Sequence, residues 1–429
     1  MNQHTFTNGF RCIYQKGTVP LSAIYVFVKY GSIHEGKGLA HFIEHMCFKG
    51  TRKIPESKAI VSNYDNIGAY INANTHKEYT VYIVKCNVEY TAHCIDILSD
   101  MMLNSVFKPS HIRLEQNVVI EECVRLNDDA EYYIETIRDR MLYQDTSYAE
   151  PVDSLDYHKT LFDTKTVQRS YREQYQPNNM GISIVSPIAF STIKKMIERS
   201  GFSQKPTLSP TSSLTSPLTY SCVTNKPQFN IMTKKGSAAT HLSISFRTCP
   251  QNHPDTYPLH LLTRILGGYM SSRMFMTLRE KHGITYKSTC SLKSYWTMGH
   301  IELYAICDPD NLMHKQGVLP LLIRMLRDLR KNGITREELE SAKGNINGAY
   351  IMNMEQIQIP CLYNGIESIL YDKPEVVPYD QLYSTHYANL TKKSVDAVIL
   401  KYMEPANMVV SIVGEDVPSQ SSIELLFRA

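Results

Sequence analysis

The sequence has 429 residues and a mass of 49.1 kDa, which is too long for one ordinary domain and fits two or three. Apolar residues make up 43% and charged residues 20%, a composition typical of globular proteins with sizeable cores. Lys and Arg number 45 against 42 Asp and Glu, with no concentrated basic block, so we expect no nucleic-acid partner.

Targeting segments and cysteine usage limit the compartments in which the protein can work. The longest apolar runs, such as residues 21–28 and 180–185, are well short of a membrane span, so we expect none. Residues 2–5 open neither a signal peptide nor an Arg-rich leader; we expect that the chain works where it is made, or that a leader was removed. Ten cysteines without a Cys-x-x-Cys pair indicate reduced thiols and exclude finger-type zinc sites. We therefore expect the cytoplasm or another reducing compartment, or the mitochondrial matrix if a leader was removed.

Strands and helices alternate along the first half. Asn8-Gly9 predicts a hairpin turn between short strands at 5–6 and 11–14. Hydrophobic periodicity then predicts strands at 21–30, 69–73 and 79–86, and helices at 38–48, 56–66, 89–103 and 110–142.

The second half resembles the first. Residues 203–221 are rich in Ser, Thr and Pro and predict an exposed linker between domains 1–202 and 222–429. Residues 175–185 resemble residues 402–413, because each is a Pro-Asn turn leading into an apolar strand. Further helices are expected at 254–266, 270–281 and 320–331, and another opens near 339. The pattern predicts an α+β fold of two homologous domains, each an antiparallel-rich sheet packed with helices.

The segment His41-Phe-Ile-Glu-His45 is the strongest chemical signal. Residues four apart lie on one face of a helix, so His41 and His45 can bind one zinc ion through their imidazole nitrogens. Glu44 lies beside them and suits a general base that takes a proton from the attacking water. The alternative is an amphipathic helix that carries two surface histidines and a glutamate.

The flanks of this segment extend the signal. Residues 38–51 read GLAHFIEHMCFKGT and resemble the signature of the inverted-motif zinc metallopeptidases, the family of pitrilysin, insulin-degrading enzyme and the mitochondrial processing peptidase. The resemblance implies one zinc per chain, with Glu122 as third ligand after 76 intervening residues. It also implies a supporting role for Glu115, seven residues earlier. The alternative for either glutamate is an exposed position on a helix.

Two further motifs match the family. Residues 72–82 read NANTHKEYTVY and resemble the family's edge strand beside the zinc, which implies that Asn72 and Ala73 contact the peptide substrate; the alternative is a plain hairpin. Residues 265–286 resemble the family's Gly-rich turn and Arg-Glu-Lys stretch, which implies that Arg279 and Tyr286 contact substrate and the developing oxyanion. Arg279 would otherwise be a solvated cation on a helix.

The resemblance is to a two-domain, catalytic subunit of the processing-peptidase type, which implies half of a clamshell. We therefore expect a zinc metalloendopeptidase that hydrolyses unfolded peptides inside a chamber closed by a second chain, with water activated by zinc and Glu44. A homodimer is the simplest arrangement, and a heterodimer is the alternative. The rival function is a non-catalytic scaffold or core-type subunit of a larger complex, and a third is a zinc-stabilised binding module.

Overall fold

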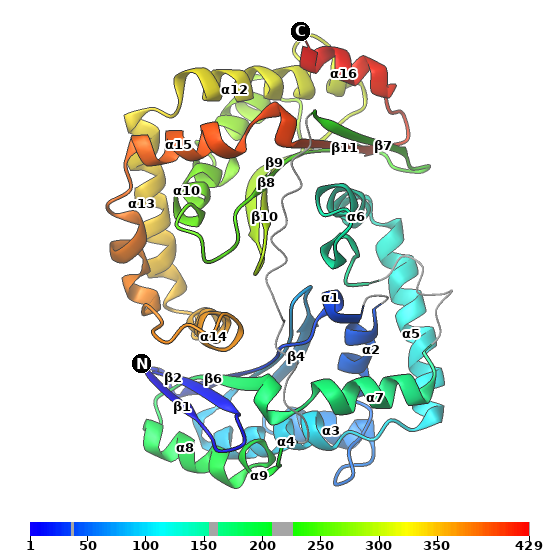
Figure 1. Cartoon of the computed structure of the whole chain (residues 1–429), viewed down its shortest axis with the longest axis vertical. Helices are drawn as coiled ribbons and strands as arrows, with labels where there is room; N and C mark the ends of the chain where they lie inside the picture. The colour runs from blue at the N-terminus through cyan, green and yellow to red at the C-terminus, as the bar shows by residue number, and fades with distance from the viewer. Residues whose placement is uncertain (36–37, 154–161, 208–225, 429) are drawn as a thin grey trace. The chain divides into compact units, whose positions relative to one another are not determined.

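A computed structural model describes residues 1–35, 38–153, 162–207 and 226–428 of the chain (Figure 1). The chain divides into two compact units, each built around its own sheet. The first unit comprises Met1–Val124, Glu150–Thr215 and Ile351–Asp380, and the second comprises Arg125–Ala149, Ser216–Tyr350 and Gln381–Ala429.

The first unit contains a six-stranded sheet in the order β1-β2-β6-β3-β5-β4. Its members are β1 (Asn2–Thr5), β2 (Arg11–Lys16), β3 (Leu21–Val28), β4 (Tyr70–Thr75), β5 (Thr80–Asn87) and β6 (Met180–Ser186). All neighbours are antiparallel except β2 and β6. The expected hairpin turn is confirmed, because β1 pairs with β2 and Gly9 takes a φ of 86°, which glycine adopts without strain. Strand β4 forms one edge of the sheet.

The second unit repeats this arrangement with five strands in the order β7-β11-β8-β10-β9. They are β7 (Gln228–Thr233), β8 (Thr240–Thr248), β9 (Lys287–Ser294), β10 (Gly299–Cys307) and β11 (Met408–Gly414). Only the β7–β11 pair is parallel. The two strands predicted to be repeats, β6 and β11, each follow a 3₁₀ turn (Pro177–Asn179 and Pro405–Asn407) and take equivalent places in their sheets. The prediction of two homologous, antiparallel-rich α+β domains is therefore confirmed.

Helices cover both faces of each sheet. In the first unit they are α1 (Ser32–Glu35), α2 (Leu39–Met46), α3 (Ser57–Asp65), α4 (Thr91–Asn104), most of α5 (Pro109–Asp128), α7 (Thr164–Gln174), α8 (Phe190–Arg199), α9 (Gly201–Gln204) and α14 (Gln358–Gly365). In the second they are α6 (Ala130–Leu142), α10 (Thr256–Gly267), α11 (Asp310–Met313), α12 (Val318–Asn332), most of α13 (Arg336–Asn353), α15 (Lys392–Tyr402) and α16 (Gln420–Arg428). Because both faces are covered, β3 and β6 are buried along nearly their whole length, which explains their continuous apolar sequences.

Neither unit is one contiguous half of the sequence, because each contains a helix from the other half. Helix α6, from the first half of the sequence, packs on β8 and β11 of the second unit. Helix α14, from the second half, packs on β3 and β6 of the first unit. These strand pairs are equivalent in the two sheets, so the exchange is reciprocal. Of the predicted linker at 203–221, the first residues complete α9, and residues 208–221 lie outside the described part of the chain.

Two predicted helices differ from the observed elements. The single helix expected at 110–142 is wrong, because α5 ends at Asp128 and α6 begins at Ala130. Between them Asp129 adopts an extended backbone, and its side chain accepts hydrogen bonds from the backbone N–H groups of Glu131 and Tyr132, which starts a new helix. The helix expected at 270–281 is mainly a π-helix at Phe275–Lys281, one of three with Ile366–Leu370 and Tyr383–Tyr387 in the described residues.

The sequence also led to predictions about membrane spans and about the cysteines. Among the described helices, none is both long enough and apolar enough to cross a membrane. The nine cysteines in the described ranges are all buried, and none of them forms a disulfide.

Candidate metal centre

Helix α2 presents a polar face to a pocket in the first unit. Gly38 precedes it in a left-handed backbone conformation, with φ 78°, which lets the chain turn into the helix. The apolar side chains of Phe42, Ile43 and Met46 are fully buried in the core against the sheet. The opposite face turns His41 and His45 toward a pocket of about 530 Å³.

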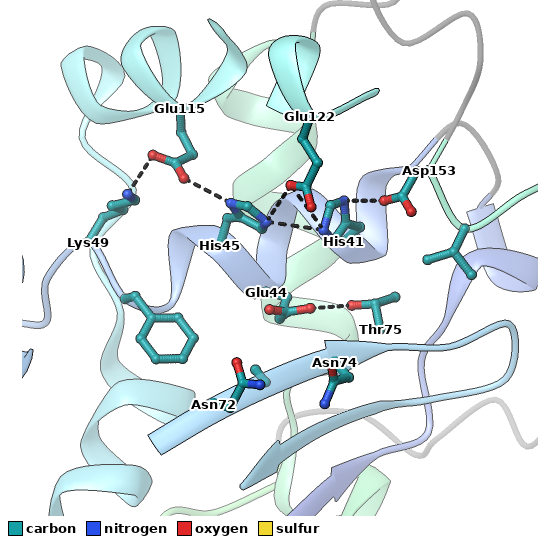
Figure 2. Close-up of a pocket in the computed structure, with 13 residues that line it drawn as sticks. His41, Glu44, His45, Lys49, Asn72, Asn74, Thr75, Glu115, Glu122 and Asp153 are labelled. Carbon is teal, nitrogen blue, oxygen red and sulfur yellow. Dashed lines mark hydrogen bonds and ion pairs between the residues drawn. The ribbon is translucent and has the colours of Figure 1, made fainter. Parts of the chain in front are cut away.

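Three potential ligand atoms converge at this pocket (Figure 2). The Nε2 atoms of His41 and His45 lie 3.0 Å apart. Glu122 comes from α5 and brings its Oε2 atom to 3.6 Å from His45 Nε2 and 4.0 Å from His41 Nε2. The predicted ligands therefore form one cluster, in which the ligand atoms lie within 4.8 Å of one another.

A carboxylate faces the outer nitrogen of each histidine ring. Nδ1 of His45 lies 2.9 Å from Glu115 Oε1, and Lys49 Nζ lies 2.5 Å from the other oxygen of Glu115. Nδ1 of His41 lies 2.8 Å from Asp153 Oδ1. Glu115 was expected near the metal centre. Asp153 was not, because no motif surrounds it and 30 residues separate it from Glu122.

The donor set fits a divalent cation. Carboxylates face both Nδ1 atoms, so when a metal ion takes the place of a proton between the two rings, the ring hydrogens lie on Nδ1 and each Nε2 offers a lone pair. Two lone pairs at 3.0 Å beside the Glu122 carboxylate repel unless a positive charge lies between them. Burial by itself would lower the pKa of His41, but the carboxylates of Asp153, Glu44 and Glu122 raise it by more, to about 9. The cluster therefore attracts positive charge. Two imidazoles and one carboxylate are a typical set for catalytic zinc.

Glu44 lies beside the cluster, nearly buried at 8% exposure. Burial raises the pKa of its carboxyl group above the usual value, although His41 and His45 oppose the shift. Thr75, on β4, donates a hydrogen bond of 2.9 Å to Glu44 Oε2 and so orients the carboxylate. A desolvated, oriented carboxylate with a raised pKa is suited to proton transfer. Thr75 lies inside the motif at residues 72–82, but no role was expected for it from the sequence.

Strand β4 forms the opposite wall of the pocket (Figure 2). Asn72 and Ala73 both line it, and β4 is an edge of the sheet. Their expected contact with a peptide substrate stays a prediction. Asn72 is exposed and Ala73 is buried at 9% exposure. A strand edge thus runs past the metal cluster.

Comparisons with known proteins agree with this geometry. Residues 11–154 match the model of insulinase (peptidase family M16), and residues 162–346 match that of the peptidase M16 inactive domain. The chain belongs to peptidase family M16. The stretch matched as inactive, residues 162–346, does not contain the His-x-x-Glu-His motif.

Relatives in the M16 family match most of the chain. An uncharacterized zinc protease of Bacillus subtilis, YmxG, is 29% identical over 380 residues, which cover 87% of this chain and 89% of the relative. Among solved structures, a protease from Helicobacter pylori superposes with a TM-score of 0.88 at 18% identity, covering 96% of this chain and 99% of that one. The periplasmic protease PqqL of Escherichia coli gives a TM-score of 0.81 at 19% identity, covering all of this chain and 49% of that one.

Two residues implied by the M16 resemblance lie in the second unit. Arg279 is exposed on the π-helix, where its guanidinium lies 5.3 Å from the ring of Phe275. Tyr286 lies just before β9 with 72% of its side chain exposed. The pocket described above is lined by residues of the first unit alone. The role of Arg279 and Tyr286 toward substrate therefore stays a prediction.

Proposed function

We propose that this protein is a zinc-dependent endopeptidase that binds one zinc ion per chain through His41, His45 and Glu122. The observation that carries the proposal is the convergence of these three side chains beside a buried glutamate, Glu44, at the free edge of a sheet. The names of the relatives as zinc proteases support the same reading.

Glu44 acts as the general base. When bound, zinc supplies a Lewis acid that polarises the scissile carbonyl and acidifies water. Glu44 accepts a proton from the attacking water and later transfers a proton to the leaving nitrogen, so that one water and one peptide bond become a carboxylate and an ammonium group. Thr75 keeps the accepting oxygen oriented through its hydrogen bond.

The free edge of β4 suits an extended peptide substrate. The backbone N–H of His76 donates to the carbonyl of Tyr79 at 2.7 Å, in register with the β4–β5 ladder. Alternation along an antiparallel strand then turns the backbone groups of Ala73 and Thr75 to the free edge. A substrate can add there as a further strand, with Asn72 and Ala73 near the scissile bond. Only an unfolded segment can pair in this way, which favours unfolded peptides as substrates.

A second chain completes the enzyme in this proposal. Arg279 and Tyr286 are donors suited to an oxyanion, and both are exposed in the second unit. We assign them to the site of a second copy, which closes the chamber around the peptide; a different M16 chain is the alternative partner. Mixing Glu44→Gln chains with Arg279→Ala chains tests this, because only a mixed dimer has an intact zinc site faced by an intact Arg279. Recovery of activity supports the arrangement, whereas free subunit exchange without recovery contradicts it.

The Glu44→Gln variant tests the chemistry itself. The change is nearly isosteric, so zinc content should stay equimolar while turnover of an unstructured fluorogenic peptide falls by about 10²–10⁴-fold. Glu121→Gln is the matched control, since Glu121 is exposed on α5 beside the ligand Glu122 and should leave both quantities unchanged. Metal removal with a chelator should abolish turnover, and added zinc should restore it. A wild-type homodimer that binds zinc but cleaves no peptide would refute the proposal in this form and favour the scaffold function.

A further inference from the structure

The two carboxylates that face the histidine rings differ in origin and charge environment. Glu115 lies on α5, one helix with Glu122, and Lys49 neutralises its charge at 2.5 Å. Asp153 comes from the segment that enters the first unit at Glu150, after α6. The contacting atoms, His41 Nδ1 and Asp153 Oδ1, are both shielded from solvent and lie 2.8 Å apart.

This segment is attached to the strand that forms the pocket wall. Lys77, in the turn after β4, is buried at 8% exposure, and its Nζ atom donates to the backbone carbonyl of Glu150 at 2.8 Å. A buried ammonium makes a stronger hydrogen bond than a neutral donor and loses much when the bond is broken. Between Glu150 and Asp153, Val152 lines the pocket. The Lys77 bond therefore fixes the backbone three residues before Asp153.

We propose that Asp153 is a positioning residue of the metal centre, which fixes the ring of His41 with Nε2 toward the metal and makes that nitrogen a stronger ligand. The inference rests on the proposed zinc site and extends it. A carboxylate that accepts the Nδ1 hydrogen prevents rotation of the imidazole ring and increases its electron density, and loss of such partners typically lowers metal affinity about 10–100-fold.

The substitutions at Asp153 separate geometry from charge. Asparagine retains an oxygen that can accept the ring hydrogen but has no charge, whereas alanine removes both. Zinc affinity, measured by competition with a chromophoric chelator and without any peptide, should fall about 10-fold for Asp153→Asn and about 100-fold for Asp153→Ala. Glu150→Gln is the matched control, because Glu150 is exposed on the same segment and does not line the pocket, and the zinc affinity of this variant should stay within about twofold of wild type.

Two further readouts separate positioning from general damage to the fold. The absorption spectrum of the Co²⁺-loaded protein reports ligand geometry and should change in Asp153→Ala but not in Glu150→Gln, while the melting temperature of the metal-free proteins stays equal. Lys77→Met should weaken zinc binding in the wild-type background and have little further effect in Asp153→Ala, since both act through His41.

The outcomes distinguish this inference from the proposed function. Wild-type zinc affinity and an unchanged Co²⁺ spectrum in Asp153→Ala would overturn the role of Asp153 even if the enzyme cleaves peptides. Conversely, a wild-type protein that binds zinc but has no peptidase activity would refute the proposed function and leave the affinity series interpretable. His41→Ala sets the lower limit of affinity in either case.

Discussion

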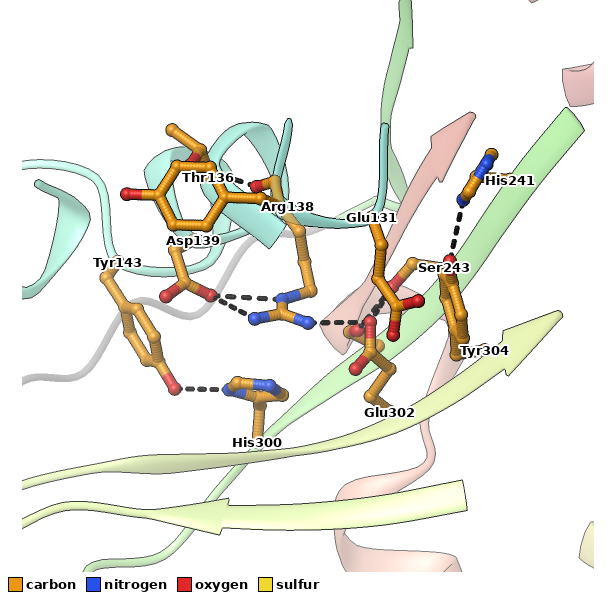
Figure 3. Close-up of polar contacts among 12 residues, drawn as sticks. Glu131, Thr136, Arg138, Asp139, Tyr143, His241, Ser243, His300, Glu302 and Tyr304 are labelled. Atoms are coloured by element: carbon orange, nitrogen blue, oxygen red, sulfur yellow. Dashed lines mark hydrogen bonds and ion pairs between the residues drawn. The ribbon is translucent and has the colours of Figure 1, made fainter. Parts of the chain in front are cut away.

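Replacement of Arg138 by Met should destabilise the second unit by about 3–5 kcal/mol. Arg138 lies on α6 with only 6% of its side chain exposed (Figure 3). Its guanidinium donates to Asp139 Oδ1 at 2.8 and 3.0 Å and lies 2.7 Å from Glu302 Oε1 on β10. Burial alone would raise the pKa of Glu302, but Arg138 keeps it below its usual value. Removal of the cation therefore leaves two buried carboxylates without their counter-charge.

The magnitude follows from burial rather than from the number of ion pairs. Lys287 on β9 and Glu131 on α6 also form an ion pair, at 2.5 Å, but their side chains are 43% and 41% exposed. Exposed pairs contribute about 0–1 kcal/mol because water screens them, so Lys287→Ala is the matched control. Because the remaining carboxylates of Arg138→Met can take up protons, its loss of stability should be smaller at pH 5 than at pH 8.

Urea denaturation followed by circular dichroism measures both variants. Replacement of Arg138, Asp139 and Glu302 together by apolar residues of similar size should recover most of the loss, since no buried charge then remains. The reasoning is refuted if Arg138→Met costs no more than Lys287→Ala, or if the triple variant is less stable than Arg138→Met.

Three further predictions concern other sites. Burial, and to a smaller extent Arg138, lowers the pKa of His300 to about 3. Between pH 6.5 and 3 only the unfolded chain takes up this proton, so the free energy of unfolding should fall by up to about 1.4 kcal/mol for each pH unit of acidification. In His300→Gln, denaturation midpoints should depend less on pH. An alanine Cβ at position 365 would lie 2.0 Å from Phe27 Cε2, so Gly365→Ala should lower the stability by about 1–3 kcal/mol in thermal melts. Adding Phe27→Leu to this variant should restore part of the lost stability. Equal melting temperatures for wild type and Gly365→Ala would contradict this packing. Thr75→Val removes the hydrogen bond to Glu44 and should lower kcat about tenfold at unchanged zinc content, and an unaltered kcat would show that Glu44 needs no orienting partner.

Local sequence determined much of this protein. The four-residue spacing of His41 and His45 requires a common helix face, and the structure has them on α2 with Nε2 atoms 3.0 Å apart. The Asn8-Gly9 turn and the two Pro-Asn turns were also predictable, because turn geometry depends on neighbouring residues alone. Glu115 and Glu122 came from the family resemblance rather than from any local rule.

Tertiary structure alone decided which distant segments meet. The contacts of Asp153 with His41 and of Lys77 with Glu150 join segments 112 and 73 residues apart, and no pattern in their sequences marks them. The same holds for α6 and α14, whose apolar faces predict burial but not the sheet on which each one packs. Periodicity reports that a side chain faces the core, since burial depends on position around a helix or strand. Which core it faces depends on contacts between residues far apart in the chain, and these exist only after folding.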